Sequence, residues 1–388
     1  MDERGQQHDH DHEQQHERIQ LSLDELLDRL GRRRTRRGLR HPPRGTDADG
    51  FMTRDELLQA EPISPTERLP EDLIREFSAD DEVVMGGDRR LIPFDELPHS
   101  ERNEYPGLRQ PWTGQNFIGR AVRQPLSRAL FEAMRHGGQG QTLFDYHPDE
   151  ELFDRSYPWC TVGRVFVGTD PNATASNWHN RYDSSGSGFM VGPRTMVTAS
   201  HVAPWEPENW WMRFVPSYWG NLAGTAFTQP FGSAWVEEFV GVPNSSGDVT
   251  GEDLVVCRLS KRLGDVTGWL ARWRFFDDDS YYDWPYTSVG YPGNPYGGER
   301  PVVQHFVAVE DVDDDGQGKE LETMPFTAEG WSGGPLFFWR GQQPYAVGVD
   351  SGREEEFDLW AGFTATHSVF SGGRRFTDLI DQAEREWP

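Results

Sequence analysis

The sequence predicts an all-β domain that follows a helical, partly disordered N-terminal segment. From about residue 155 onward, apolar runs of five to eight residues recur between clusters of Gly, Pro, Asn and Asp, which is typical of short strands joined by turns. The last residues, 375–387, instead carry apolar side chains at helical spacing. Up to residue 150 the sequence is polar, interrupted by proline and poor in strand patterns. We therefore divide the chain into an N-terminal extension, 1–150, and a β domain, 151–388.

About a dozen short strands with turn signals between them indicate an all-β sandwich or a pair of barrels. The predicted strands cover residues 162–167, 188–191, 195–199, 210–215, 235–240, 254–259, 287–291, 302–309, 321–326, 335–339, 345–349 and 360–366. The predicted C-terminal helix has Phe376, Leu379, Ile380 and Ala383 on one face. We expect this face to pack against the strands.

Within the N-terminal extension we predict three short helices, over residues 22–30, 53–60 and 126–134. Each of the first two begins with Ser or Thr followed three residues later by Glu, which is the spacing of a capping box. Segments rich in proline or glycine lie between the helices and read as linkers. The basic cluster at 32–40 is typical of a solvated face or a flexible arm. The extension is either a pro-segment or a permanent domain through which a regulatory partner binds.

Composition limits the classes of partner. The 388 residues carry a net charge of −26, with 35% hydrophobic residues, enough to bury one large or two medium cores. An acidic surface of this kind argues against binding nucleic acid or anionic membranes and favours cationic partners. The sequence contains no apolar run of about 18 residues, the length that a membrane-spanning helix needs.

The N-terminus lacks the basic start and apolar stretch of a secretory signal. We therefore expect a cytoplasmic protein, the alternative being a secreted one whose leader is absent from this chain. Two cysteines, Cys160 and Cys257, are too few for a disulfide framework. We interpret them as buried thiols, and a single bridge between them is the alternative.

Three residues far apart in the chain suggest nucleophilic catalysis. Ser332 lies in the sequence EGWSGGPL, His201 lies in TASHV, which closes an apolar run, and Asp253 lies in GEDLVV, which opens another. A serine hydroxyl is a weak nucleophile that needs an imidazole to take its proton and a carboxylate to hold the ring in the right tautomer. Glycines on both sides of Ser332 permit a tight turn whose N–H groups can face a developing oxyanion. The three residues together predict a catalytic triad.

Five segments, in order along the chain, resemble those of trypsin-like serine proteases. The most similar branch is that of the bacterial glutamyl endopeptidases, or V8 proteases. The segments are residues 157–159 (YPW), 187–202 (SGFMVGPRTMVTASHV), 251–256 (GEDLVV), 289–293 (VGYPG) and 330–335 (GWSGGP). This resemblance covers roughly residues 155–388. It implies a chymotrypsin-like fold, in which two six-stranded antiparallel β-barrels are followed by a C-terminal helix.

The resemblance also implies an activity, that of a serine endopeptidase acting on protein or peptide substrates. Ser332 would attack the scissile carbonyl, His201 would act as general base and then acid, and Asp253 would orient the imidazole. The backbone N–H groups of Gly330 and Ser332 would bind the oxyanion. No cofactor is required for this chemistry. Two alternatives remain: a catalytically silent protease-like binding module, and a latent protease held inactive by its N-terminal segment.

The sequence departs from the family pattern at two places. Trypsin-like zymogens have an aspartate directly before the serine, but Trp331 stands here, so activation through that ion pair is not available. The glutamyl endopeptidases bind a substrate glutamate with a His and with a Thr or Ser five residues before the nucleophile. Thr327 matches the second residue, whereas Asp350 replaces the first. With Ser351 and Gly352 completing the expected pocket, Asp350 predicts a preference for Arg or Lys. Whether His367 on the following strand compensates is left open.

An acidic segment raises the question of calcium. Asp311, Asp313, Asp315 and Glu322, with a glycine at 316, follow the ligand spacing of an EF-hand loop, although strands flank the segment. A structural calcium ion is one interpretation and a solvated hairpin tip is the other. Residues 47–56 resemble the latter part of such a loop, but capping of a helix by Thr53 explains most of the pattern. Four N-terminal histidines could bind a transition metal adventitiously, although a disordered tail explains them too. They are His8, His10, His12 and His16.

Overall fold

The structure is a computed structural model. It describes residues 69–78, 82–92, 97, 100–113, 144–145 and 156–387, apart from 222, 295, 341–342 and 359–362. The chain divides into two compact units, 1–50 and 51–388, and every described residue belongs to the second. The three helices predicted in the N-terminal extension, the segment 47–56 and the four N-terminal histidines lie outside the described residues.

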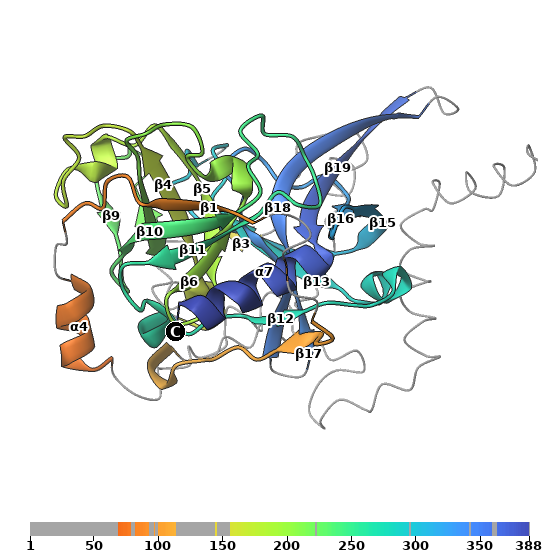
Figure 1. Cartoon of the computed structure of the whole chain (residues 1–388), viewed down its shortest axis with the longest axis horizontal. Helices are drawn as coiled ribbons and strands as arrows, with labels where there is room; N and C mark the ends of the chain where they lie inside the picture. Colours follow the sequence, from red (N-terminus) through yellow and green to blue (C-terminus); the bar gives the residue numbers. More distant parts are fainter. Residues whose placement is uncertain are drawn as a thin grey trace, which may run out of the picture. The chain divides into compact units, whose positions relative to one another are not determined.

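Strands make up most of the described elements (Figure 1). The strands are β1 (Asp88–Leu91), β2 (Glu104–Tyr105), β3 (Phe144–Asp145), β4 (Val162–Gly168), β5 (Ser184–Met190), β6 (Thr195–Thr198), β7 (Trp211–Pro216), β8 (Trp219–Gly220), β9 (Phe227–Thr228), β10 (Ala234–Gly241), β11 (Val255–Leu259), β12 (Ala271–Trp273), β13 (Tyr286–Gly290), β14 (Val302–Val307), β15 (Val309–Asp315), β16 (Gly318–Thr323), β17 (Pro335–Arg340), β18 (Gln343–Asp358) and β19 (Phe363–Gly372). The α-helices are α4 (Glu71–Ser78), α6 (Gly264–Thr267) and α7 (Gly373–Glu386). Short 3-10 turns are η2 (Pro111–Thr113), η5 (Trp159–Thr161), η6 (Trp178–Asn180), η7 (Ser200–Val202) and η8 (Asp278–Asp283).

The first β-unit is a closed barrel. Its strands follow the order β10, β11, β6, β5, β4 and β7, and the pairing of β7 with β10 closes the ring. All six strands of this ring pair antiparallel with their neighbours. Every residue of β4 and β6 is buried, since one face of the barrel wall meets the interior and the other meets covering loops. This unit confirms the predicted six-stranded antiparallel barrel.

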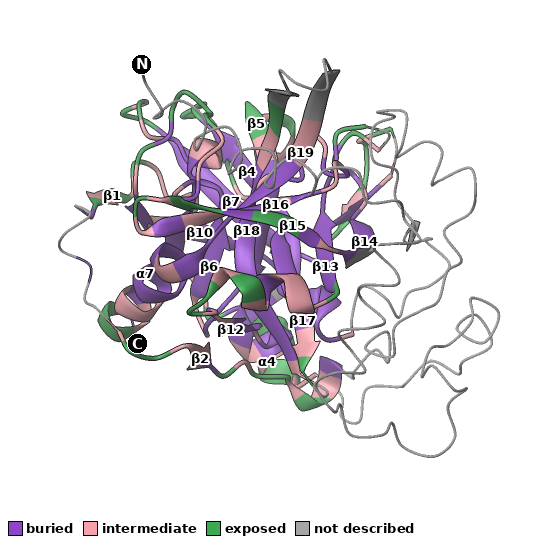
Figure 2. Cartoon of the chain, turned by 90° about the vertical axis from the view of Figure 1, so that its right-hand side faces the viewer, coloured by how far each residue is buried: buried purple, intermediate pink, exposed green. Residues whose placement is uncertain are grey.

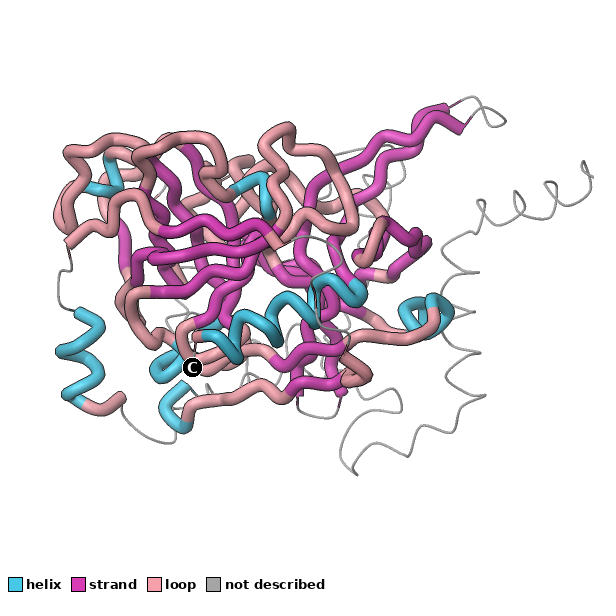
Figure 3. Tube along the Cα trace, viewed as in Figure 1, coloured by secondary structure: helices cyan, strands magenta, loops and turns pink. Residues whose placement is uncertain are grey.

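The second β-unit is a ten-stranded, mainly antiparallel sheet. Its main path runs β15, β16, β19, β18, β17, β13, β14 and β3, while β12 pairs with β18 and β2 pairs with β12. No pairing among the described residues closes this sheet into a ring. Strands β18 and β19 run on past the sheet as a two-stranded ribbon (Figure 3). The central strands of both units are mostly buried, and exposed residues gather in loops (Figure 2).

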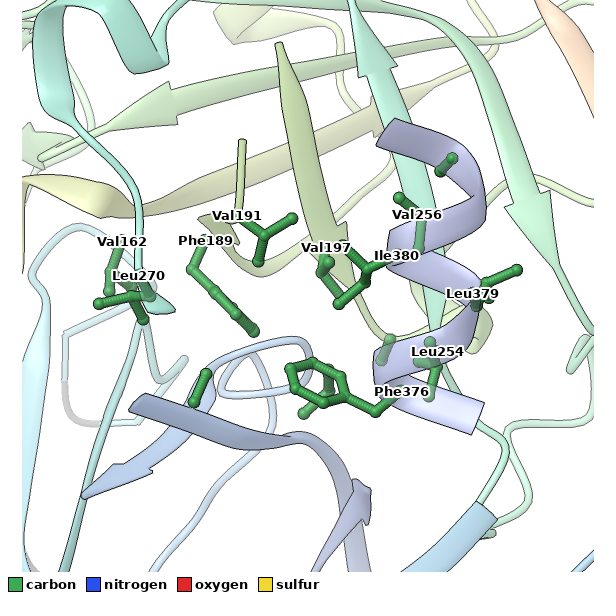
Figure 4. Close-up of a cluster of buried hydrophobic side chains, with 14 of the residues drawn as sticks. Val162, Phe189, Val191, Val197, Leu254, Val256, Leu270, Phe376, Leu379 and Ile380 are labelled. Carbon is green, nitrogen blue, oxygen red and sulfur yellow. The ribbon is translucent and has the colours of Figure 1, made fainter. Parts of the chain in front are cut away.

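Helix α7 packs where the two β-units meet. Its four predicted apolar residues, Phe376, Leu379, Ile380 and Ala383, are all fully buried. They belong to one core cluster with residues of the first barrel and of the second sheet (Figure 4); these include Val197, Leu254, Val256, Phe337 and Val349. Burying such a side chain stabilises a fold by about 1.5–3 kcal/mol, so α7 contributes substantially to holding the units together. The predicted C-terminal helix and its buried face are confirmed.

Part of the N-terminal extension forms strands that the sequence did not predict. β1 pairs parallel with β10, β2 pairs antiparallel with β12, and β3 pairs antiparallel with β14. These strands are two to four residues long and contain charged side chains, so they carry no alternating apolar pattern. The expectation of an extension poor in strands is therefore corrected for the described part of residues 1–150.

The two cysteines lie apart and are buried as free thiols. Cys160 Sγ donates a hydrogen bond to the carbonyl oxygen of Thr267 at 3.2 Å, and Cys257 Sγ lies 4.0 Å from Met212 Sδ. Burial raises the pKa of both thiols above the ordinary value. The interpretation as buried thiols is confirmed. None of the described helices is long and apolar enough to cross a membrane.

Candidate active site

A tight turn after β6 positions His201. The strand ends at Thr198, and η7 follows at once, with the N–H of Ala203 bonded to the carbonyl of Ser200 at 3.0 Å. The Trp205 indole N–H donates to the same carbonyl at 3.0 Å. His201 therefore leaves the barrel wall on a fixed backbone, and its side chain stays 23% exposed.

Asp253 is a buried carboxylate that accepts three hydrogen bonds. Its side chain is 0% exposed. Oδ1 accepts from the His201 backbone N–H at 2.9 Å, while Oδ2 lies 2.7 Å from His201 Nδ1 and accepts from Ser351 Oγ at 2.7 Å. A carboxylate in this position holds the proton on Nδ1, which leaves Nε2 as the basic nitrogen of the ring. The structure thus brings together two of the three predicted catalytic residues.

Ser332 lies in a loop that is fixed by backbone hydrogen bonds. Its own carbonyl accepts from the N–H of Ser187 in β5 at 2.8 Å, and the next N–H, that of Gly333, donates to the carbonyl of Asp350 in β18 at 2.8 Å. On the other side of the serine, Ser187 Oγ donates to the carbonyl of Gly330 at 2.8 Å. We call residues 327–334 the nucleophile loop, after the predicted role of Ser332. This loop is therefore hydrogen bonded to both β-units, and Ser332 is only partly buried.

Glycine is required on both sides of Ser332. Gly330 and Gly333 have φ of 90° and 91°, in the region that favours glycine. A β-carbon on Gly333 would lie 2.0 Å from the carbonyl oxygen of Ser187, so a larger residue would push the loop away from β5. Within the described part of the chain, the backbone N–H groups of Gly330 and Ser332 donate no hydrogen bond. Two N–H groups at a strained turn are suited to bind an oxyanion.

Trp331 holds the nucleophile loop in place through its buried side chain. The side chain is 1% exposed, its indole N–H donates to Ser288 Oγ at 2.9 Å, and its ring meets Phe326 edge to face at 5.5 Å. Gly290 lies against the same ring, because a β-carbon there would come within 2.4 Å of it. In place of an ion pair at this position, the protein fixes the loop by aromatic packing and one hydrogen bond.

Ser332 and Val202 border the same glycine of β5. A β-carbon on Gly186 would lie 2.9 Å from the carbonyl oxygen of Ser332 and 2.8 Å from Val202, the residue after His201. No hydrogen bond joins Ser332 Oγ to the His201 ring among the described residues. In unliganded enzymes such bonds are often long and tighten only when substrate binds.

The predicted pocket residues are all described, but they differ in burial and in their contacts. Thr327 and Asp350 are each 1% exposed. Ser351 is the extra residue where the pairing of β18 with β19 shifts between Asp350 and Gly352, and its hydroxyl donates to Asp253. Gly352 adopts φ of 154° beside Val249. The His367 ring lies 3.6 Å from a Glu322 oxygen and so pairs with the acidic hairpin.

The acidic segment is a β-hairpin rather than an EF-hand loop. Strands β15 and β16 pair closely, placing Asp311 opposite Glu322 and Asp313 opposite Glu320. The Asp315 carboxylate accepts a hydrogen bond from the backbone N–H of Gly251 at 3.0 Å, so one of its oxygens already has a partner outside the hairpin. Carboxylate oxygens of Asp313, Glu320 and Glu322 lie within 4.8 Å of one another. The segment therefore forms the hairpin that was the alternative to a calcium loop. Binding of calcium stays a prediction, and the carboxylates close enough to share an ion are those of Asp313, Glu320 and Glu322.

Sequence reasoning missed the residues that support the site. Ser351 bonds to Asp253 from 98 positions away, and it lies at an irregularity in the pairing of β18 with β19 that no signal in the sequence predicts. Ser187 ties β5 to the nucleophile loop through a serine that has no motif of its own. Buried Arg164 forms an ion pair with Glu299 at 2.8 Å, which links β4 to the loop before β14.

Comparisons with known proteins give similarity to solved structures alone. No family model matches the chain, and no curated protein matches it either. Protease Anisep from Arthrobacter nicotinovorans aligns at 18% identity and a TM-score of 0.40, over 58% of this chain and 96% of that one. The thermostable serine protease AL20 from an extremophilic microorganism aligns at 16% identity and 0.41, over 58% and 97%. A Glu endopeptidase in complex with MPD aligns at 18% identity and 0.40, over 59% and 92%. The structure is thus similar to those of three proteases, at low sequence identity.

Proposed function

We propose that this chain is a serine endopeptidase that cleaves peptide bonds in protein substrates through an acyl-enzyme. The observation that carries the proposal is the buried Asp253 carboxylate, which bonds to both the backbone and Nδ1 of His201. Burial of a carboxylate costs free energy unless hydrogen bonds replace the water that it loses. The hydrogen bonds of Asp253 do so, and they also fix the imidazole in the tautomer of a general base. The nucleophile loop with its free N–H groups supports the same function.

Acylation begins when Ser332 Oγ attacks the scissile carbonyl carbon. The new C–O bond forms as the carbonyl π pair moves to oxygen, and the hydroxyl proton passes to His201 Nε2. Asp253 stabilises the resulting imidazolium through its bond to Nδ1. The N–H groups of Gly330 and Ser332 would hold the oxyanion. Collapse breaks the C–N bond, and the imidazolium gives its proton to the leaving amine.

Deacylation repeats the sequence with water as the nucleophile. His201 takes a proton from water as its oxygen attacks the acyl carbon, and collapse then breaks the bond to Ser332 Oγ. The proton returns to the serine, so the enzyme is regenerated and the substrate is left as an acid and an amine. Apart from the substrate and this water, the groups in the cycle are Ser332, His201, Asp253 and the N–H groups of Gly330 and Ser332.

A latent protease is the second candidate. It is favoured by one observation: within the described residues, Ser332 Oγ makes no hydrogen bond to His201. In a latent form the two groups would move within reach only after processing or binding of a partner. The latent form has the same active residues, so it differs from the first candidate in timing and not in chemistry.

The test is covalent labelling with a fluorophosphonate probe, read by intact mass and followed by digestion of an unstructured protein substrate. The native chain should be labelled once, and Ser332→Ala should abolish labelling. Ser332→Ala should also lower turnover by on the order of 10⁴-fold or more. His201→Ala should have nearly as large an effect. Ser176→Ala removes an exposed serine outside the site and serves as the matched control.

Three results separate the candidates. Labelling of the native chain at Ser332 supports an active enzyme. Labelling that develops only after limited proteolysis of the N-terminal extension supports the latent form. A chain that stays unlabelled before and after trimming, and digests no substrate, would contradict both and favour a protease-like binding module.

A further inference from the structure

Asp350 is a buried carboxyl group without a hydrogen-bond partner. It lies in β18 and is 1% exposed, and neither of its side-chain oxygens is hydrogen bonded to another described residue. Leaving a buried acid unsatisfied costs free energy, since the group loses its water and gains nothing in return. Such groups are few in folded proteins and often have a role in binding.

The position of Asp350 relates it to the nucleophile. Its backbone N–H donates to the carbonyl of Gly334, and its carbonyl accepts from the N–H of Gly333, each at 2.8 Å. The strand residue is therefore bonded on both sides to the two residues that directly follow Ser332. Thr327, five residues before Ser332, is close enough to the Asp350 carboxyl to affect its pKa. The Asp350 backbone is thus bonded to the nucleophile loop, and its carboxyl lies near Thr327.

Three charged or polar groups act on the Asp350 carboxyl. Burial and then the charge of Asp253 raise the pKa of Asp350 well above its ordinary value, while the Thr327 hydroxyl and the Arg353 guanidinium oppose this shift. The Thr327 hydroxyl donates its proton to Ser368 Oγ at 3.0 Å, so it does not satisfy the acid. Arg353 forms no ion pair with Asp350 within 4 Å. A cation that enters the site would find an acid ready to ionise toward it.

We propose that Asp350 sets the substrate class of this site, accepting the ammonium or guanidinium group of a Lys or Arg side chain on the acyl side of the cleaved bond. This inference rests on the proposed function. When Ser332 attacks a carbonyl carbon, the side chain of that same residue is the substrate group closest to the loop. A long, thin side chain with a charge at its tip suits a carboxyl that is nearly closed to solvent.

Exposed acids on the second β-unit agree with a basic substrate. Glu354 and Glu355 follow Asp350 along β18 and are exposed. Asp313 and Asp314 are exposed on β15, which joins β18 through β16 and β19. Acidic side chains on this sheet, in a chain of net charge −26, raise the local concentration of cationic segments and repel acidic ones.

Arg353 offers the opposite chemistry and defines the competing outcome. Its Nε and Nη2 atoms are buried without a hydrogen-bond partner among the described residues, and burial lowers the pKa of its guanidinium. Were Arg353 the residue that receives the substrate, the side chain chosen would be acidic. The two assignments predict opposite effects of substitution, so one set of peptides decides between them.

The test is a series of peptides that differ only in the residue before the cut: Lys, Arg, Gln, Ala or Glu. With the active form of the native chain, kcat/KM for Lys and Arg should exceed that for Gln and Ala by on the order of 10²-fold or more. Asp350→Asn should remove most of this advantage while Gln peptides change little. Arg353→Gln should leave the Lys and Arg preference in place or increase it, because it removes a like charge. Preference for Glu that Arg353→Gln abolishes would overturn the proposal.

A second measurement needs no variant. Benzamidine and n-butylammonium should slow labelling of the native chain by the fluorophosphonate probe, and butyrate should not. Equal protection by the cation and the anion would overturn the assignment even if Asp350→Asn failed to fold. Labelling with no preference among the five peptides contradicts the role of Asp350 alone, whereas absence of labelling under all conditions contradicts the proposed endopeptidase as well.

Discussion

At the scale of single residues, the site depends on two buried acids that differ in their partners. Asp253 accepts three hydrogen bonds, two of them from His201, whereas Asp350 has none. Both lie in the neighbourhood of Ser351, which follows Asp350 and bonds to Asp253. The first acid is stabilised by its contacts and the second is not, so removing each should affect stability in opposite directions.

Asp350→Asn should stabilise the folded protein at neutral pH. Burial and the charge of Asp253 raise the pKa of Asp350, so the folded chain keeps a proton that the unfolded chain releases. The free energy of unfolding therefore falls as pH rises from the ordinary pKa through the raised one. Asparagine does not ionise, so the free energy of unfolding of the variant lacks this decrease with pH. We expect a gain of about 1–3 kcal/mol at about pH 8 that shrinks toward pH 4, measured by urea unfolding.

Asp314→Asn is the matched control for this experiment. Asp314 is 79% exposed and pairs with Lys319 at 2.6 Å, and the loss of such an exposed ion pair changes stability by at most about 1 kcal/mol in most proteins. A gain of equal size in both variants would point to relief of the net negative charge. A loss of stability in Asp350→Asn at all pH values would show that the acid has a partner in the folded state.

At the scale of elements, the limits of prediction follow from side-chain pattern. Strands with continuous apolar runs, such as β4 and β6, lie within a residue or so of their predicted bounds. β15 escaped prediction as a strand of its own because five of its seven residues are acidic, although Val309 and Val312 face the core. β18 continues past residue 349 through an acidic stretch that is held by pairing with β19. Strand pairing, which sequence does not display, decides such cases.

The candidate site shows the same limits. Motifs identified His201 and Asp253, whose side chains are bonded to each other in the structure. The contact of Ser351 with Asp253, by contrast, depends on the irregular pairing between Asp350 and Gly352, where β18 has one residue more than β19. The sequence does not display the position of such a bulge. Motifs therefore predict reacting groups better than the residues that hold them.

The acidic hairpin yields a prediction that also tests for calcium. Partial burial, then the charges of Asp315, Glu354 and Asp313, raise the pKa of Glu320 to about 7. Stability should fall as pH rises from the ordinary value to about 7, because the folded state holds the proton longer than the unfolded one. Glu320→Gln should therefore be more stable than the native chain at about pH 8 and similar to it at about pH 4.5, by urea unfolding.

Calcium reverses the expectation for Glu320. If the cluster of Asp313, Glu320 and Glu322 binds the ion, millimolar calcium should stabilise the native chain at high pH and Glu320→Gln should lose that gain. Glu355→Gln, an exposed glutamate on β18, provides the control for general charge effects. No calcium response in the native chain would leave the hairpin as a solvated acidic surface.

At the scale of the whole molecule, the described part of residues 69–113 pairs with strands of both β-units. β1 adds to the first barrel beside β10, and β2 adds to the second sheet beside β12. Side chains from this stretch are buried in the cores: Phe77, Ile92, Leu97 and Tyr105 are between 2% and 6% exposed. Arg274 donates to two carbonyls of the same stretch, those of Ser100 and Arg102, at 2.7 and 3.0 Å.

From these contacts we predict that residues 69–113 are a permanent part of the fold and not a removable pro-segment. Burial of each of the four side chains stabilises the fold by about 1.5–3 kcal/mol, and their removal would expose the apolar surfaces that they cover. A chain that begins at residue 156 should therefore fail to fold or should aggregate. A chain that begins at residue 69 keeps all of these contacts and should match the full chain in thermal unfolding.

The same reasoning predicts what a cut between 114 and 155 would do. Because the strand pairings of β1 and β2 and four buried side chains remain on the cleaved piece, it should stay bound to the β domain without a covalent link. Size-exclusion chromatography of the nicked protein should then show one species, and urea should separate it into two. Activity that develops while the piece remains bound would mean that cutting frees the active site locally. Release of the piece in native buffer would instead identify residues 69–113 as part of a true pro-segment, since their contacts would then be too weak to hold it.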